Sequence, residues 1–156
     1  MLTHLKTTLV AFFTLITISF AGEVNVNFDS RLNLNYLKIF NSINKKTSFV
    51  IFANPNSPTG TIIEPEKIIR IIQKAKKNNC YVIIDEAYFG FYSKTYIKYV
   101  KKFENLIIIR TFSKSLGLAG IRAGYMASNE KLIEKLYKFR PMYEINSFAV
   151  LLIKEI

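Results

Sequence analysis

The chain has 156 residues, half of them hydrophobic, which is enough for one ordinary domain with a sizeable core. Its 22 basic and 11 acidic residues give a net charge of +11, but the lysines are scattered and form no arginine-rich stripe, so we expect no nucleic-acid partner. A single cysteine and a single histidine exclude an intrachain disulfide, a cysteine metal site and a Ser-His-Asp or Cys-His mechanism. We expect no metal site.

Residues 1–21 allow two interpretations. A weakly basic start, an apolar segment over residues 9–20 and the sequence Ser19-Phe20-Ala21 outline a secretory signal, which would imply export. The alternative, which we favour, is a remnant of a core helix that runs without a linker into residues 22–29. A transmembrane span is not expected, because the apolar run is shorter than the roughly 20 residues that a bilayer needs.

Four apolar runs predict the strands of a sheet. They cover residues 49–53, 80–84, 105–110 and 122–127. A helix is predicted to open at Glu64-Pro65-Glu66, to end at Asn78-Asn79, and to bury a stripe made of Ile68, Ile69, Ile72 and Ala75. Further helices are expected over residues 129–139 and from residue 148. This alternation predicts an α/β fold of three layers, with a mainly parallel sheet and helices on both faces.

Polar groups follow the first two predicted strands. Asn54 comes directly after the first, and Asp85 ends the second. The carboxyl ends of parallel strands meet at one edge of the sheet, which is where open α/β sheets bind ligands. Tyr88 follows Asp85 by three residues. Each of these three residues also has a purely structural interpretation: Asn54 can start a turn with Pro55, Asp85 can cap the next segment, and Tyr88 can pack in the core.

The segment from Thr111 to Gly124 carries the clearest chemistry. Lys114 is flanked by two hydroxyl residues and is followed, eight residues later, by Arg122 in a glycine-rich turn. An aldehyde cofactor with a phosphate needs such a set, because the amine can form a Schiff base while Thr111, Ser113 and Arg122 hold the phosphate. The alternative is an ordinary basic loop.

Three motifs, NPNSPTG from Asn54, VIIDEAYFGFY from Val82 and TFSKSLGLAGIRAGY from Thr111, occur in this order. Together they resemble fold-type I pyridoxal 5'-phosphate (PLP) enzymes, specifically class I/II aminotransferases and most closely those of the histidinol-phosphate type. The resemblance covers residues 24–156. It implies that residues 22–156 form an incomplete PLP-binding large domain.

The resemblance also implies a role for each residue. Lys114 would bind PLP covalently and then act as the general base. Asp85 would face the pyridine nitrogen, and Asn54 and Tyr88 would hydrogen-bond the phenolic oxygen. The cofactor phosphate would be held by Thr111, Ser113 and Arg122.

The implied activity is transfer of an amino group between an amino acid and a 2-oxo acid or related carbonyl compound, in a cytoplasmic homodimer. Family members are more than twice as long, so we expect a chain that lacks segments at both ends. The alternatives are a non-catalytic remnant and a related PLP-dependent decarboxylase, since the bond broken depends on how the substrate is held.

Overall fold

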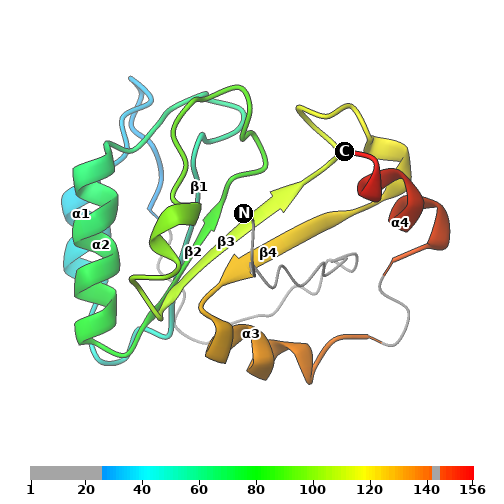
Figure 1. Ribbon diagram of the computed structural model, residues 1–156. Coiled ribbons are helices and arrows are strands. Elements are labelled where there is room, and N and C mark those ends of the chain that lie inside the picture. Colours follow the sequence, from blue (N-terminus) through cyan, green and yellow to red (C-terminus); the bar gives the residue numbers. More distant parts are fainter. Residues whose placement is uncertain (1–25, 142–144) are drawn as a thin grey trace.

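The structure is a computed structural model that describes residues 26–141 and 145–156 (Figure 1). Both interpretations of residues 1–21 therefore concern residues outside the described part. The elements in chain order are α1 (Tyr36–Ser42), β1 (Phe49–Ala53), α2 (Pro65–Lys77), β2 (Tyr81–Asp85), η1 (Ile97–Tyr99), β3 (Leu106–Thr111), η2 (Ala119–Ile121), β4 (Gly124–Ser128), α3 (Glu130–Tyr137) and α4 (Ser147–Lys154).

The four strands form one sheet in the order β1-β2-β3-β4. The first three run parallel, and β4 pairs antiparallel with β3. The register sets Ala53 beside Asp85 and Asp85 beside Ile109, so the first three strands end almost level. The predicted mainly parallel sheet is confirmed, and the loops that follow β1, β2 and β3 all leave from its carboxyl edge.

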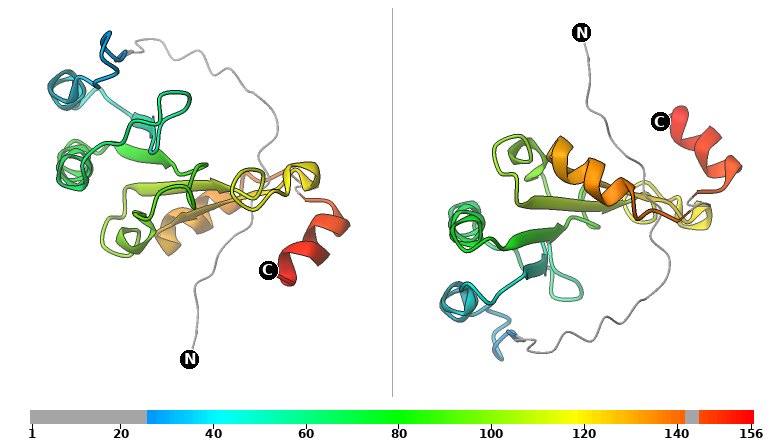
Figure 2. Two further views of the ribbon diagram at one scale, coloured as in Figure 1. Left: turned by 90° about the horizontal axis from the view of Figure 1, so that it is seen from above. Right: turned by 90° about the horizontal axis from the view of Figure 1, so that it is seen from below.

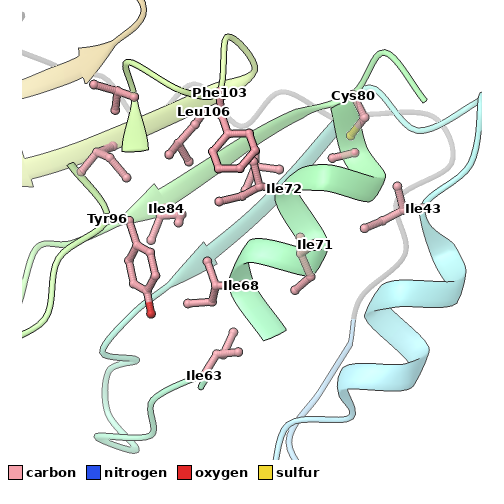
Figure 3. Close-up of a cluster of buried hydrophobic side chains, with 14 of the residues drawn as sticks. Ile43, Ile63, Ile68, Ile71, Ile72, Cys80, Ile84, Tyr96, Phe103 and Leu106 are labelled. Atoms are coloured by element: carbon pink, nitrogen blue, oxygen red, sulfur yellow. The ribbon is translucent and has the colours of Figure 1, made fainter. Parts of the chain in front are cut away.

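Helix α2 covers one face of the sheet and packs against it in the main core (Figure 3). Pro65 stands in its first turn with Glu66, and three of its lysines, Lys74, Lys76 and Lys77, lie in its last turn, an arrangement that suits the helix dipole. Its fully buried residues are Ile68, Ile71, Ile72 and Ala75, which follow the i, i+3, i+4, i+7 spacing of a helix face. They pack on Val82, Ile84, Leu106 and Ile108 of the central strands.

Helix α3 lies on the opposite face, so the molecule has the three expected layers (Figure 2). Ile133 and its neighbours pack on Ile107 and Met126 of β3 and β4. Within the described residues this cover stops short of β1, where the Phe49 and Ile51 side chains are 42% and 61% exposed. The short helix α4 packs with Phe112, Ile121 and Ala123 near the carboxyl edge of β3.

Several predicted details need correction. Ile71, not Ile69, completes the buried stripe of α2, because Ile69 points about a quarter turn away from Ile68 and is only partly buried. Strand β4 begins at Gly124 rather than at Arg122, whose backbone is in the left-handed conformation (φ 56°) and cannot extend a strand. Helix α1 was not predicted. No helix in the described residues is long and apolar enough to cross a membrane.

Replacing Ile72 by alanine is expected to lower the free energy of unfolding by about 2–5 kcal/mol, because the side chain is fully buried and a cavity would remain. Urea unfolding followed by circular dichroism measures this change. The matched control is Ile51→Ala, whose side chain is 61% exposed and should have a much smaller effect. Equal losses in the two variants would contradict the described core.

Candidate active site

The carboxyl edge of the sheet brings the predicted polar residues together. Backbone pairing continues past the strand ends, since the amide of Asn54 donates to the Asp85 carbonyl (2.9 Å) and the amide of Glu86 donates to the Ile109 carbonyl (2.8 Å). The segments that carry Asn54, Asp85 and Tyr88 are therefore held side by side at the start of their loops. Sequence spacing alone predicted this edge, and the structure places these residues there.

Asp85 is a half-buried carboxylate. Its Oδ1 accepts a hydrogen bond from the amide of Ala87 (2.9 Å), and among the described residues no cation forms an ion pair with it. Burial raises the pKa of this carboxyl, and the Ala87 amide only partly opposes the shift. A charged carboxylate in such a place is well suited to a ligand that brings a protonated nitrogen.

Tyr88 lies between Ser57 and Lys114. Its hydroxyl is 3.2 Å from Ser57 Oγ, and Lys114 Nζ is 5.4 Å from the centre of its ring. The Ser57 hydrogen bond and then the positive charge of Lys114 lower the pKa of the Tyr88 phenol, while the negative charge of Asp85 acts in the opposite direction. Three different loops thus meet at one phenol, with an amine beside it.

The loop that carries Lys114 is held by its own backbone. The amide of Gly117 donates to the Lys114 carbonyl (3.0 Å), and the amide of Leu118 donates to the Phe112 carbonyl (3.0 Å). Thr111 Oγ1 accepts from the amide of Ser113 (3.1 Å) and donates to the Ala123 carbonyl (3.3 Å). The hydroxyl of Thr111 therefore shapes the loop, while the Lys114 side chain is exposed.

Gly90 fixes how closely the Tyr88 loop approaches the Lys114 loop. Its φ is +102°, and a Cβ at this position would lie 2.7 Å from the Cβ of Ser115. Only glycine meets both conditions, because other residues rarely adopt this backbone and would collide with Ser115. The glycine in the sequence VIIDEAYFG thus allows the two loops to pack directly.

The remaining predicted residues differ in their burial and in their hydrogen bonds. Asn54 is 1% exposed; its Oδ1 accepts from the amide of Ile63 (2.8 Å), but its Nδ2 has no hydrogen-bond partner within the described part of the chain. Ser113 is half-buried beside Lys114. Arg122 is exposed, and one of its guanidinium nitrogens donates to the Ala119 carbonyl (3.4 Å). Phosphate binding by Thr111, Ser113 and Arg122 stays a prediction.

Sequence reasoning missed three residues. The first is Ser57, which stands in NPNSPTG and contacts Tyr88. The other two are Glu86, which directly follows Asp85, and Arg110, which forms an ion pair with Glu86 beneath the site. For Glu86 a signal was present in the sequence. It is the second carboxylate at the end of an apolar run, and a carboxylate that is buried in such a place needs a partner. For Ser57 the sequence held no comparable signal, because its contact spans 31 positions.

A lysine and a carboxylate at the carboxyl edge of an open α/β sheet are typical of enzymes that bind a ligand there. Residues 16–154 match the family described as aminotransferase class I and II, and the chain belongs to this family. It is 42% identical over 130 residues to the histidinol-phosphate aminotransferase of Caldanaerobacter subterraneus subsp. tengcongensis. That match covers 83% of this chain and 36% of the relative, so the chain spans little more than a third of it.

Solved structures agree with this assignment. The histidinol-phosphate aminotransferase of Clostridium acetobutylicum superimposes with a TM-score of 0.72 at 32% identity, over 81% of this chain and 39% of that one. The histidinol-phosphate aminotransferase of Sinorhizobium meliloti, solved in complex with pyridoxal 5'-phosphate, gives a TM-score of 0.72 at 25% identity, over 81% and 35% of the two chains. The fold is that of the fold-type I PLP-dependent transferases, as expected.

Replacing Asp85 by asparagine should stabilise the protein at neutral pH. A carboxyl whose folded pKa lies above its unfolded value of 3.8 contributes stability at low pH that is lost as the pH rises through the folded pKa. Asparagine has no charge to bury, so it avoids this loss of stability, and its side-chain oxygen can still accept the hydrogen bond from the Ala87 amide. Because Asp85 is only partly buried and solvent screens its charge, the gain should be a fraction of a kcal/mol.

Urea titrations of the two proteins from neutral pH to below pH 3.8 check the sign. The stability advantage of Asp85→Asn should be largest at neutral pH and shrink as the pH falls. Glu104→Gln, at an exposed carboxylate, serves as the control. An advantage that grows toward low pH would show that Asp85 is stabilised by its surroundings instead.

Replacing Ser57 by alanine should raise the pKa of Tyr88, because the Ser57 hydrogen bond is the main cause that lowers it. The ultraviolet absorbance of tyrosinate against pH, with the titration of a Tyr88→Phe variant subtracted, isolates this one phenol. Ser93→Ala, an exposed serine, is the control. An unchanged Tyr88 titration would mean that the Ser57 contact does not form in solution.

Proposed function

We propose that this chain forms a PLP-binding core of the histidinol-phosphate aminotransferase type, and that it takes part in amino-group transfer between an amino acid and a 2-oxo acid or related carbonyl compound. The observation that carries the proposal is the placement of Lys114 beside Tyr88 at the sheet edge that also holds Asp85. The membership of the aminotransferase family supports the same activity.

The polar groups at this edge fit the cofactor. Asn54 Nδ2 is a buried amide without a partner among the described residues, which is costly unless an acceptor such as a phenolic oxygen occupies its site. Asp85 offers a negative charge to a protonated ring nitrogen, and Lys114 offers an exposed amine to an aldehyde. A set with an amine, a carboxylate and an amide matches the aldehyde, pyridine and phenol of PLP.

When bound, PLP supplies an electron sink for the charge left on the substrate Cα. The chain's own residues have separate tasks. Asp85 would hold a proton at the pyridine nitrogen, and Tyr88 and Asn54 would donate to the phenolic oxygen. Lys114 Nζ would hold the cofactor and, as a free amine, would take the proton from the substrate Cα.

The substrate class follows from the relatives. The three proteins compared above are named histidinol-phosphate aminotransferases, and this chain shares 42%, 32% and 25% identity with them. A phosphorylated amino compound would also suit the net charge of +11, through long-range attraction. We therefore propose the histidinol-phosphate type of transamination for the protein to which this core belongs.

Reductive trapping tests the proposal. The purified chain is mixed with PLP, the visible band of the lysine adduct is recorded, and borohydride is added before peptide mass mapping. Most of the label should lie on Lys114. The Lys114→Ala variant should lose the label and the band, while Lys131→Ala, which removes an exposed lysine on α3, should keep both.

Label spread evenly over many lysines, or equal label in Lys114→Ala, would contradict the proposal. The chain would then be a remnant of an aminotransferase that no longer holds the cofactor, which is the second function expected from the sequence. A specific adduct at Lys114 would justify assays of amino transfer, in which the loss of activity in Lys114→Ala is the decisive control.

A further inference from the structure

An ion pair lies beneath the candidate site. Glu86 is 2% exposed and Arg110 is 8% exposed, and the guanidinium donates to Glu86 Oε2 through Nη2 (2.8 Å) and Nε (3.0 Å). The other ion pair within the described residues, Lys76 with Glu104, is long (3.7 Å) and exposed. Burying two charges carries a large desolvation cost, so Glu86 and Arg110 call for an explanation.

The two side chains connect four segments of the chain. Besides Arg110, the Glu86 carboxylate accepts from Thr95 Oγ1 (2.7 Å) and from the amide of Tyr96 (2.7 Å). Arg110 Nη1 donates to Tyr125 Oη (3.0 Å) on β4, and the guanidinium lies 3.5 Å from the centre of the Phe89 ring. The end of β2, the segment before η1, β3 and β4 are therefore joined through one carboxylate and one guanidinium.

Both members are adjacent in sequence to site residues. Glu86 follows Asp85 and precedes Tyr88 by two positions, and Arg110 precedes Lys114 by four. Side chains alternate along a strand, so Glu86 and Arg110 lie on the α2 face with Ile84 and Ile108, while Asp85 lies on the other face with Ile83. Any effect of the pair on the site would therefore pass through the backbone.

We propose that Glu86 and Arg110 are positioning residues, which hold the Asp85–Tyr88 segment and the Lys114 loop in a fixed relation from the far face of the sheet. This inference rests on the proposed function, since it assigns the pair to the same site. Stability alone is a poor explanation of the pair, because apolar residues of similar volume often replace a buried ion pair at no cost in stability. What the pair adds is directional: four donors converge on one carboxylate, and they fix its place relative to β3.

The test uses the full chain with two variants of graded severity and one control. Glu86→Gln removes the charge and keeps the shape. Thr95→Val removes the hydroxyl that donates to Glu86 and accepts from Arg110 Nη2 and the Ile97 amide, and it leaves both charges in place. The control is Glu104→Gln, which breaks the exposed Lys76 pair. Without cofactor, hydrogen exchange followed by mass spectrometry measures the peptides over residues 85–90 and 111–118. With PLP, the pH midpoint of the visible band at Lys114 is measured.

Positioning predicts that both peptides exchange faster together in Glu86→Gln, by about tenfold, and less strongly in Thr95→Val. It also predicts a shift of more than about half a unit in the pH midpoint of the adduct, because the charges around Lys114 move relative to the cofactor. Glu104→Gln should change neither. A purely structural pair would lower the melting temperature and leave the midpoint unchanged.

The proposal is overturned if folded Glu86→Gln keeps wild-type exchange in both peptides, or if exchange rises while the midpoint stays the same. If Glu86→Gln does not fold, Thr95→Val decides by the same two criteria. If the wild-type chain forms no adduct at Lys114, the proposed function fails. In that case the exchange measurement still decides whether Glu86 and Arg110 hold the two segments together.

Discussion

Two consecutive carboxylates at the end of β2 are sent to opposite faces of the sheet by the pleat of the strand, and the site depends on this separation. Glu86 turns to the α2 face, where Arg110, Thr95 and the Tyr96 amide satisfy it. Asp85 turns to the other face, where no described cation pairs with it. One carboxylate is thus paired within the protein, and the other has no ion-pair partner among the described residues.

The electrostatics of the edge follow from this division. Burial raises the pKa of Asp85, so its ionised form costs folding free energy, whereas Tyr88 is drawn toward ionisation by Ser57 and Lys114. The buried charge of Asp85 and the Asn54 amide nitrogen, which has no partner among the described residues, are both unfavourable and lie at the same sheet edge. Proteins retain such unfavourable groups where a bound ligand relieves them. A cofactor with a cationic nitrogen and an anionic oxygen would pair with the Asp85 carboxylate and with the Asn54 amide.

Much of the fold could be predicted because its signals are local. The runs before Asn54 and Asp85 are short, apolar and bounded by polar residues, and they became β1 and β2 as expected. Helix α2 was marked by Pro65 at its start and by its apolar spacing. The short helix α1 buries no residue and so lacks such a stripe, and the antiparallel direction of β4 depends on how the loop after β3 returns.

The sequence predicted which polar residues meet at this edge, but not the contacts that support them. Asn54, Asp85 and Tyr88 meet at one edge because the carboxyl ends of parallel strands always do. The link from Glu86 to Arg110 spans 24 positions and that from Ser57 to Tyr88 spans 31, and no sequence periodicity reports contacts of that kind. Such pairings become visible only once strand order and register are known.

The central claim is that this sheet edge orients PLP through Lys114 and Asp85. A crystal structure of the borohydride-reduced chain tests it most directly, because the reduced adduct cannot dissociate. We predict a pyridine nitrogen within hydrogen-bond distance of the Asp85 carboxylate and a phenolic oxygen beside Tyr88. A ring attached to Lys114 that points into solvent, with Asp85 making no contact with it, would contradict the account.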